Sequence, residues 1–409
     1  MTNVSKRSED INESITLKLN AKAVALAKEG QKVYNLTAGQ LPYRPPKELV
    51  EAIRGELDFL KSFQYSPVAG DGELLEKLID YVETSRSISF EDYDHRFAAT
   101  VGNGGKHVLA NIFAALVNPG DEVIVFAPYW ISYPQMIKLN GGVIKVVEAS
   151  IYNAFEPDLE KLKELLSDKT KAIILNSPNN PSGVFYNEKW MKSFAEIIKP
   201  FENTYVISDE IYYELNYYDP RPTYFYQYDR ELLSRTIIVD GISKSLASTG
   251  LRLGYCIAHE DIISAIKKIQ GHTASGSCSL IQRALLRYNL NQIDEYLSPV
   301  KKHLRENSLI LREVLRENQL EKCWYQVTSA FYFLMDFSSA PIIEKFKKSE
   351  DDQTDYSVQI CEQLLEEKGV AMVPSGDFGL PNCARMSLVL PKDDFRDAII
   401  ALSEFLTRE

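Results

Sequence analysis

Residues 236–255 read TIIVDGISKSLASTGLRLGY, and the fold that we predict is built outward from this stretch. Its first residues, Thr236–Asp240, are mostly apolar and β-branched, which is typical of a strand buried on both faces of a sheet. Small residues then surround Lys244, and Arg252 comes just before a second apolar run at Leu253–Ala258. A lysine at the end of a buried strand can be desolvated, which lowers the pKa of its amine and makes it reactive toward carbonyl groups.

Short apolar runs alternate with helical patterns along the chain that precedes this stretch. We expect further strands at Phe97–Val101, Glu122–Ala127, Val143–Val147, Lys171–Asn176 and Thr204–Ser208. The helical patterns between them are Lys106–Val117, Ser132–Leu139, Leu159–Leu166 and Glu188–Ile198. This alternation predicts an α/β fold, in which a large domain has a mainly parallel sheet flanked by helices.

The pattern changes after about residue 300 and predicts a smaller α+β domain. Its expected helices are Val300–Asn318, Ser357–Lys368 and Asp393–Leu406, and its expected strands are Ala330–Phe337, Val370–Pro374 and Ala384–Leu390. We therefore predict an N-terminal arm or lid at 1–20, a small domain made of 21–48 with 300–409, and a large domain at 49–299.

Composition narrows the class of protein. The 409 residues exceed what one ordinary core needs, and the 45% hydrophobic content is typical of a globular protein. A net charge of −11 without a basic stripe argues against nucleic acid as a partner. Five scattered cysteines without a CxxC pair indicate reduced thiols and neither disulfides nor a metal site. With no signal peptide or membrane-spanning run, we expect a cytoplasmic protein that has no membrane partner.

Polar residues at the ends of the expected strands indicate a ligand site, because open parallel sheets bind ligands beyond the carboxyl ends of their strands. Gly104, Gly105 and Lys106 follow the first expected strand and open a helix, an arrangement that can form a phosphate cup. Trp130, after the next strand, can stack on a flat heterocycle. Asn180, in the SPNNPSG loop, can donate a hydrogen bond.

Three further residues extend this set. The carboxylate of Asp209 can meet a cationic ring nitrogen, Tyr212 can bond a phenolic oxygen, and Arg252 can fork onto a phosphate. Each residue alone is more often an ordinary surface or core residue. In combination with Lys244 they match the needs of pyridoxal 5'-phosphate (PLP), namely a Schiff-base lysine, a partner for the pyridine nitrogen, a donor to the ring oxygen, a stacking face and a phosphate cup.

The motifs SPNNPSG, SDEIY, SK-x₅-G-x-R-x-G-Y and PYW-x-SYP resemble those of class I, fold type I PLP-dependent aminotransferases, the aspartate aminotransferase family. The similarity runs from SITLKLNAKA near residue 14 to ARMSLVL at 384. It implies that Lys244 holds PLP covalently and then moves a proton between the substrate Cα and the cofactor. It also implies that Asp209 keeps the pyridine nitrogen protonated, and that Tyr212 and Asn180 bond the ring oxygen.

The same resemblance implies the remaining site residues. Those that surround the phosphate are Gly104, Gly105, Lys106 and Arg252, while Trp130 stacks on the cofactor ring. Those that bind the substrate are Gly39, Trp130, Asn180 and Arg385, with Arg385 gripping the α-carboxylate as a bidentate pair. Tyr65, in QYSPVAG, resembles a tyrosine that reaches the phosphate of the neighbouring subunit, so the resemblance implies a homodimer with composite active sites.

The sequence departs from the family pattern in two places. Gly241 stands where the family often has a serine that donates to the phosphate, so we expect that bond either to be lost or to be replaced by Ser243 or water. The loop Gly39–Tyr43 reads GQLPY instead of the common GEPDF, and Leu41 and Tyr43 suggest a pocket that tolerates aromatic or aliphatic side chains. In the opposite direction, Ser14-Ile15-Thr16 resembles a lid, and Lys18 would provide a cation for a dicarboxylate.

We therefore expect a ping-pong transfer of an amino group between an L-amino acid, with aspartate favoured, and 2-oxoglutarate. An aromatic or other broad-specificity aminotransferase and a PLP lyase or synthase of the same fold remain alternatives. A ligand-sensing half of a transcription regulator would need a DNA-binding domain where the sequence has a short polar arm. A catalytically dead scaffold is disfavoured because Lys244, Asp209 and Arg385 are all retained.

Overall fold

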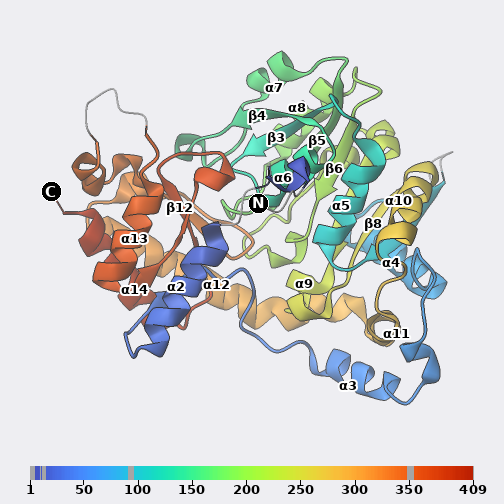
Figure 1. The fold of residues 1–409 in the computed structure, drawn as a ribbon, viewed down its shortest axis with the longest axis horizontal. Coiled ribbons are helices and arrows are strands. Elements are labelled where there is room, and N and C mark those ends of the chain that lie inside the picture. The colour runs from blue at the N-terminus through green and yellow to red at the C-terminus, as the bar shows by residue number, and fades with distance from the viewer. Residues whose placement is uncertain (1–4, 10, 12–14, 91–95, 348–353, 409) are drawn as a thin grey trace.

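The computed structural model describes residues 5–9, 11, 15–90, 96–347 and 354–408, and a seven-stranded sheet lies at its centre (Figure 1). The strands are β2 (Phe97–Gly102), β3 (Glu122–Ala127), β4 (Val143–Glu148), β5 (Thr170–Asn176), β6 (Tyr205–Asp209), β7 (Thr236–Gly241) and β8 (Gly254–His259). Their order is β2-β8-β7-β6-β5-β3-β4, and β8 alone in this sheet runs against its neighbours. The predicted mainly parallel sheet is confirmed.

Helices cover both faces of this sheet, as strand residues that alternate between two hydrophobic clusters require. In β3, Val123 and Val125 pack in the cluster that contains α5 (Gly105–Leu116), α6 (Ser132–Leu139) and α10 (Glu260–Thr273). Ile124 and Phe126 face the other cluster, with α4 (Gly72–Arg86) and α8 (Glu188–Ile198). The expected helices at 132–139 and 188–198 have the predicted bounds.

Strand β4 differs from the prediction that all strands of the sheet are buried on both faces. It lies at the edge of the sheet and pairs only with β3, and Val143 and Val146 are 44% and 37% exposed. An apolar run alone does not tell an edge strand from a central one, because the position in the sheet is set by pairing with distant residues.

The C-terminal part of the chain, with one short strand from near the N-terminus, forms a smaller unit of helices and strands. The antiparallel strands β9 (Tyr332–Asp336), β12 (Cys383–Ser387) and β11 (Val373–Pro374) form one sheet, and β1 (Tyr34–Asn35) pairs in parallel with β10 (Val370–Ala371). The helices here are α12 (Ile293–Glu317), α13 (Ser357–Lys368) and α14 (Lys392–Leu406). The smaller α+β unit is thus present, and the division at 21–48 with 300–409 and 49–299 stays a prediction.

Two elements of this part differ from expectation. The expected single strand at 370–374 is two strands in different sheets, β10 and β11, separated at Met372. Helix α12 begins at Ile293 and runs through Pro299, whereas the prediction started it at 300. The buried residues Ile293, Leu297 and Val300 form one apolar stripe, so packing outweighs the hydrogen bond that the proline removes.

The remaining helices are α1 (Lys6–Glu9), α2 (Ile15–Lys28), α3 (Lys47–Glu56), α7 (Leu159–Leu165), α9 (Ile242–Ser245) and α11 (Ser279–Arg287). No helix among the described residues is long and apolar enough to cross a membrane. Of the predicted N-terminal lid, Ser14 lies outside the described residues, as do the side chains of Ile15, Thr16 and Lys18.

Candidate active site

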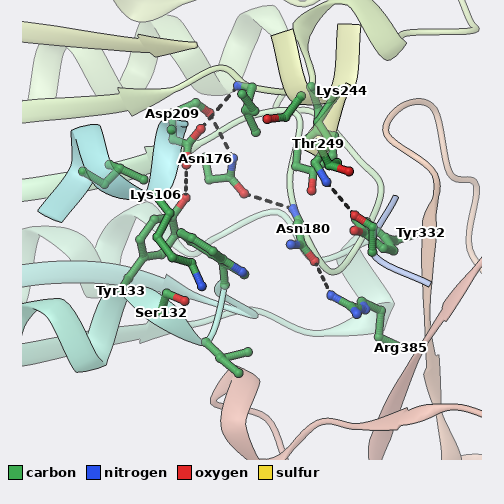
Figure 2. Close-up of a pocket in the computed structure, with 18 of the residues that line it drawn as sticks. Lys106, Ser132, Tyr133, Asn176, Asn180, Asp209, Lys244, Thr249, Tyr332 and Arg385 are labelled. Atoms are coloured by element: carbon green, nitrogen blue, oxygen red, sulfur yellow. Dashed lines mark hydrogen bonds between the residues drawn. The ribbon is translucent and has the colours of Figure 1, made fainter. Parts of the chain in front are cut away.

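A cavity of about 430 Å³ opens at the carboxyl ends of the parallel strands, and its lining comes from both parts of the chain (Figure 2). The lining residues are Gly39, Gly105, Lys106, Leu109, Trp130, Ile131, Ser132, Tyr133, Gln135, Asn176, Asn180, Asp209, Ile211, Tyr212, Ser243, Lys244, Thr249, Arg252, Tyr332 and Arg385. Most of them lie at the end of a strand of the large sheet or within a few residues after it. This is the edge where open parallel sheets bind ligands.

Asp209 ends β6 and presents a buried carboxylate to the cavity. Its Oδ2 accepts a hydrogen bond of 2.6 Å from the Tyr133 hydroxyl, and its Oδ1 accepts one of 3.3 Å from the Ile211 N–H. The amide of Asn176 donates to the Asp209 carbonyl at 2.9 Å and so fixes the strand end. Burial raises the pKa of Asp209 to about 6, although the Tyr133 hydrogen bond opposes that rise. A cation placed against this carboxylate would relieve its desolvation.

Lys244 lies in the short helix α9 that follows β7, and its Nζ donates to the Gly39 carbonyl at 2.6 Å. Nζ also lies 5.8 Å from the centre of the Tyr212 ring. Burial lowers the pKa of Lys244, and the nearby guanidinium groups of Arg385 and Arg252 lower it further. An amine with a lowered pKa is a better nucleophile at neutral pH, which is what bond formation with an aldehyde requires.

Arg252 and the glycine turn after β2 lie against each other and form a cationic cradle. Gly104 has a left-handed φ of +86°, and a Cβ there would come within 2.5 Å of Arg252 Nη2. Arg252 itself has φ +52°, and its guanidinium donates to the carbonyls of Thr249 and Asn103. The turn leads into the N-terminus of α5, where free N–H groups favour an anion. This cradle suits a phosphate.

Gly241 is explained by the packing of the adjacent strand. A Cβ at Gly241 would lie 2.8 Å from Gly254 Cα and 2.9 Å from the Leu253 carbonyl oxygen, closer than real Cβ contacts allow. A serine would not fit at this position without a shift of β8. Ser243, which lines the cavity, is left as the nearby hydroxyl.

Arg385 reaches the cavity from β12, opposite the strand ends of the large sheet. It is 5% exposed, and its Nη1 donates to Asn180 Oδ1 at 3.2 Å while its Nη2 lies 3.4 Å from the Thr37 carbonyl. The buried Nε has no hydrogen-bond partner in the structure. A buried guanidinium with a free donor can accept a carboxylate in a fork geometry.

Trp130 and Lys106 form another wall of the cavity. The Lys106 ammonium lies 4.8 Å from the centre of the Trp130 ring, and the Trp130 ring meets Tyr133 edge-on at 5.4 Å. Burial lowers the pKa of Lys106, and the nearby charge of Arg252 adds to that decrease. Lys106 lines the cavity from a position that stays open to solvent, and it adds an amine to the residues of the cradle.

The structure brings together nearly all the residues that the sequence predicts for the site. All of them line the cavity except Gly104, which borders it through Arg252, and Tyr65. Tyr65 is 95% exposed and lies beside a separate hollow with Phe63 and Cys278. Of the loop Gly39–Tyr43, only Gly39 lines the cavity, so Leu41 and Tyr43 do not shape it as expected.

Sequence reasoning missed several lining residues, among them Tyr133, Asn176, Thr249 and Tyr332. Tyr133 belongs to the quoted motif PYW-x-SYP and Asn176 ends an expected strand, so both carried a signal. Tyr332 carried none, because it comes from a distant part of the chain and reaches the site only through the fold.

The cavity fits PLP on observations of the structure itself. The buried carboxylate of Asp209 needs a cationic partner, and the amine of Lys244 has a lowered pKa. The Arg252 guanidinium lies so close to Gly104 that the glycine position has no room for a side chain. Among the described residues, no group of His, Cys, Asp and Glu side chains could hold a metal ion.

Comparisons with known proteins agree with this geometry. Residues 31–402 match the family described as "Aminotransferase class I and II". The chain is 36% identical to an aspartate aminotransferase of Thermotoga maritima, over 98% of this chain and 99% of that one. It is 32% identical to an aspartate/prephenate aminotransferase of Thermus thermophilus over the full length of both. A solved Thermus thermophilus aspartate aminotransferase with maleate is similar at a TM-score of 0.86, with 32% identity over 99% of this chain and 100% of that one.

Proposed function

The chain belongs to the class I and II aminotransferases, which use PLP, and from that premise we propose that it transfers the amino group of aspartate to 2-oxoglutarate. The observation that carries the proposal is the cavity itself. It combines the Lys244 amine and the buried carboxylate of Asp209 with two separate cationic positions for substrate carboxylates, Arg385 and Lys106.

PLP, when bound, supplies an aldehyde that holds the amino group and a pyridine ring that takes up the electron pair released at the substrate Cα. Lys244 would hold the cofactor, and its amine would act as the base that moves the proton at the substrate Cα. Asp209 keeps the pyridine nitrogen protonated, and Tyr133 holds the Asp209 carboxylate in place. Tyr212 and Asn180 bond the ring oxygen, and Trp130 stacks on the ring.

The phosphate of the cofactor is bound by the cradle of Gly104, Gly105, Arg252 and the backbone N–H groups at the start of α5, including that of Lys106. The position of Gly241 has no room for a hydroxyl, and the side chain of Ser243 supplies one nearby. Arg385 grips the α-carboxylate of every substrate, with Asn180 and Gly39 beside it. Because Arg385 ignores the side chain of the substrate, it does not select among amino acids.

Selection of a dicarboxylate is instead the role that we assign to the Lys106 side chain. In the described part of the chain Lys106 contacts the Trp130 ring and has no carboxylate partner. A second carboxylate on the substrate would supply that partner at the far end of the cavity from Arg385. A relative solved with maleate, which is a dicarboxylate, supports a substrate with two carboxylates.

A half-reaction screen tests the function directly. Each amino acid is added to the purified holoenzyme, and the visible cofactor absorbance is followed as the amino group is transferred. We expect aspartate and glutamate to convert the absorbance, and 2-oxoglutarate to restore it. Release of product without any stable aminated cofactor would identify a lyase or synthase. A kcat/KM for phenylalanine or tyrosine ten times that for aspartate would make the aspartate assignment wrong.

The variant Lys106→Met is expected to lower kcat/KM for aspartate by about 10²-fold, because one charge-assisted contact to the second carboxylate is lost. The kcat/KM for alanine, which has no second carboxylate, should stay within a few fold of the wild type. The dissociation constant of PLP serves as the control, since a role of the Lys106 side chain in phosphate binding would weaken it. An equal loss for aspartate and alanine would contradict selection by Lys106.

We also propose that the chain forms a symmetric homodimer. Large apolar side chains are exposed beside α11 on the segment 57–65, namely Leu57, Phe59, Leu60, Phe63 and Tyr65. Exposed apolar patches of this kind favour a protein interface. Buried Glu56 pairs with Arg283 and Arg287 and so anchors the segment in place. In such a dimer, Tyr65 of the partner subunit would reach the phosphate cradle.

Mixing two inactive variants tests the composite site. Tyr65→Ala and Lys244→Ala dimers are each expected to be crippled, while a hybrid dimer holds one site with an intact lysine and an intact tyrosine. After dissociation and equal mixing, activity should recover to about a quarter of the wild-type value, because half of the dimers are hybrid with one good site each. A monomer by sedimentation, or no recovery, would count against the proposal.

We place the enzyme in the cytoplasm. All five cysteines are free in the structure, and four of them are buried. Free thiols of this kind suit a reducing compartment.

A further inference from the structure

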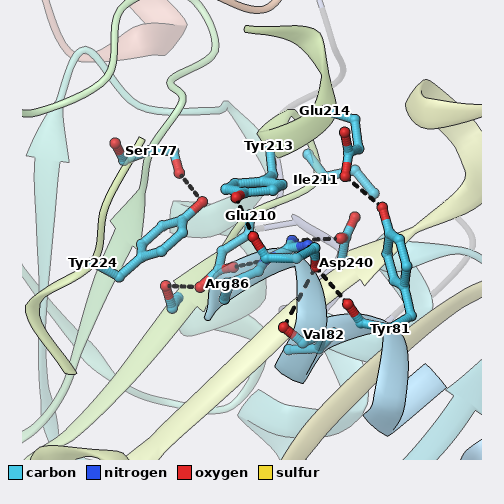
Figure 3. Close-up of polar contacts among 12 residues, drawn as sticks. Tyr81, Val82, Arg86, Ser177, Glu210, Ile211, Tyr213, Glu214, Tyr224 and Asp240 are labelled. Atoms are coloured by element: carbon cyan, nitrogen blue, oxygen red, sulfur yellow. Dashed lines mark hydrogen bonds and ion pairs between the residues drawn. The ribbon is translucent and has the colours of Figure 1, made fainter. Parts of the chain in front are cut away.

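A fully buried arginine, Arg86, pairs with two carboxylates, Glu210 and Asp240, that lie next to strand ends of the candidate active site (Figure 3). Arg86, the last residue of α4, has a side chain that is 0% exposed. Its Nε is 3.0 Å from Glu210 Oε2 and its Nη2 is 2.7 Å from Asp240 Oδ2. The guanidinium also lies over the Tyr213 ring at 3.8 Å. Burial alone would lower the pKa of Arg86, but the Asp240 and Glu210 carboxylates raise it above its usual range.

Both carboxylates have further donors. Ser208 Oγ and the Tyr226 hydroxyl each donate to Glu210 Oε1 at 2.8 Å, and the Tyr255 hydroxyl donates to Asp240 Oδ2 at 3.2 Å. A buried ion network with satisfied partners has a defined geometry, since any displacement leaves a charge without a partner in a low-dielectric interior. The Arg86 network is therefore a rigid part of the core.

Each carboxylate is tied to one catalytic residue through the backbone. Glu210 directly follows Asp209, and its N–H donates to the Val239 carbonyl of β7 at 2.8 Å. Asp240 lies in β7, and its Oδ1 accepts a hydrogen bond of 2.7 Å from the N–H of Gly241, the residue before α9. Helix α9 carries Lys244. One guanidinium therefore links the end of β6 to the turn that presents the lysine.

We propose that Arg86 is a positioning residue that, by clamping Glu210 and Asp240, sets the spacing between Asp209 and Lys244. The inference rests on the proposed function, because that spacing matters only if the two residues act on one cofactor. It assigns Arg86 no contact with substrate or cofactor, since Arg86 does not line the cavity.

A simple role in stability explains the network less well. Replacement of a buried ion pair by apolar residues is often neutral or stabilising, so an arginine kept between two carboxylates is poor evidence of stabilisation. The network also has two carboxylates for one guanidinium, and Asp240 is among the groups that raise the pKa of Asp209. The Arg86 charge thus limits the negative potential that reaches the active site.

Loss of the Arg86 charge should shift the apparent pKa of groups in the active site, and the direction of that shift can be measured. The titratable and charged groups that face Arg86 and its carboxylates are Tyr81, Tyr213, Glu214, Tyr224, Tyr226 and Tyr255. Arg221 is a cation next to this group, but it pairs with Glu214 at 3.8 Å and not with Glu210 or Asp240, so the network without Arg86 becomes more negative. A more negative neighbourhood favours the protonated form of any group in the site, which raises its apparent pKa.

The test compares Arg86→Met, Arg86→Lys and the control Arg235→Met as holoenzymes. Arg235 is also partly buried, but it donates to carbonyls of Ile198, Lys199, Phe201 and Thr204 at the other end of the sheet. For Arg86→Met we expect kcat to fall by about 10²-fold with little change in KM. The pH midpoint of the visible cofactor absorbance should rise by about one pH unit. Arg235→Met should keep the wild-type kcat and midpoint.

Arg86→Lys keeps a positive charge and so avoids two unpaired carboxylates if Arg86→Met does not fold. A lysine has no fork to hold both partners, and we expect about a tenfold loss of kcat with a midpoint close to the wild type. Wild-type kcat and midpoint in either folded Arg86 variant would overturn the positioning role. Absence of a cofactor band from the wild-type protein would overturn the proposed function and this inference together.

Discussion

Replacing Lys244 by alanine is expected to reduce kcat by 10⁴-fold or more, on the order of the combined loss of a covalent anchor and a general base. Lys244 is presented by α9 toward the buried carboxylate of Asp209, and its amine has a lowered pKa because of burial. The variant should still fold, since the cavity side of Lys244 makes a single hydrogen bond to the Gly39 carbonyl.

Lys106 provides the matched control, because it is the second lysine in the cavity and its pKa is also lowered by burial. Borohydride reduction of the wild-type holoenzyme should fix the cofactor to the peptide that contains Lys244, as read by mass spectrometry. Lys106→Met should keep that label, and Lys244→Ala should lose it. A label on Lys106, or full turnover of Lys244→Ala, would contradict the assignment.

The central sheet could be predicted from the sequence because most of its strands are local apolar runs. The runs at Glu122–Ala127 and Thr236–Asp240 match β3 and β7 to within one residue. Elements whose limits depend on distant contacts could not be predicted in the same way. The break at Met372 between β10 and β11 is set by pairing with residues 34–35 and with β12, and the start of α12 is set by its apolar stripe.

In the candidate site, too, residues with a local sequence signal could be predicted and residues placed by distant contacts could not. Residues at a strand end or just after it, such as Asp209 and Lys244, could be predicted because the carboxyl edge of a parallel sheet gathers them in one place. Tyr332 and Arg86 were not, since nothing in their local sequence indicates that the fold brings them to the site or behind it. From the sequence, Arg86 in particular is one more charged residue until its burial at the end of α4 is known.

Replacing Asp209 by asparagine is expected to reduce kcat by about 10²- to 10³-fold, the usual effect of removing a preorganised charge partner. Asparagine keeps the shape of the side chain and can still accept the hydrogen bond from Tyr133. It has no charge to hold the pyridine nitrogen protonated. Asp209→Glu, which keeps the charge, should retain more activity than Asp209→Asn, and near wild-type turnover of the asparagine variant would refute the role.

The same substitution should stabilise the protein without its cofactor, and the sign follows from the pKa. The Asp209 carboxyl has a pKa of about 6 in the fold, above the value of about 3.9 in an unfolded chain. The folded state therefore binds this proton more tightly, and stability falls as pH rises from about 4 to about 6. Asparagine has no such proton, so we expect Asp209→Asn to be more stable at pH 8, by up to about 3 kcal/mol.

Unfolding of the cofactor-free proteins at pH 4 and pH 8 measures this difference, which should vanish at the lower pH. A difference that is the same at both values would show that packing and not charge is responsible. The expected result would mean that the Asp209 carboxylate serves the chemistry of the site while it lowers the stability of the cofactor-free protein. Bound PLP would reverse the balance, because a protonated ring nitrogen would be a partner for the buried carboxylate.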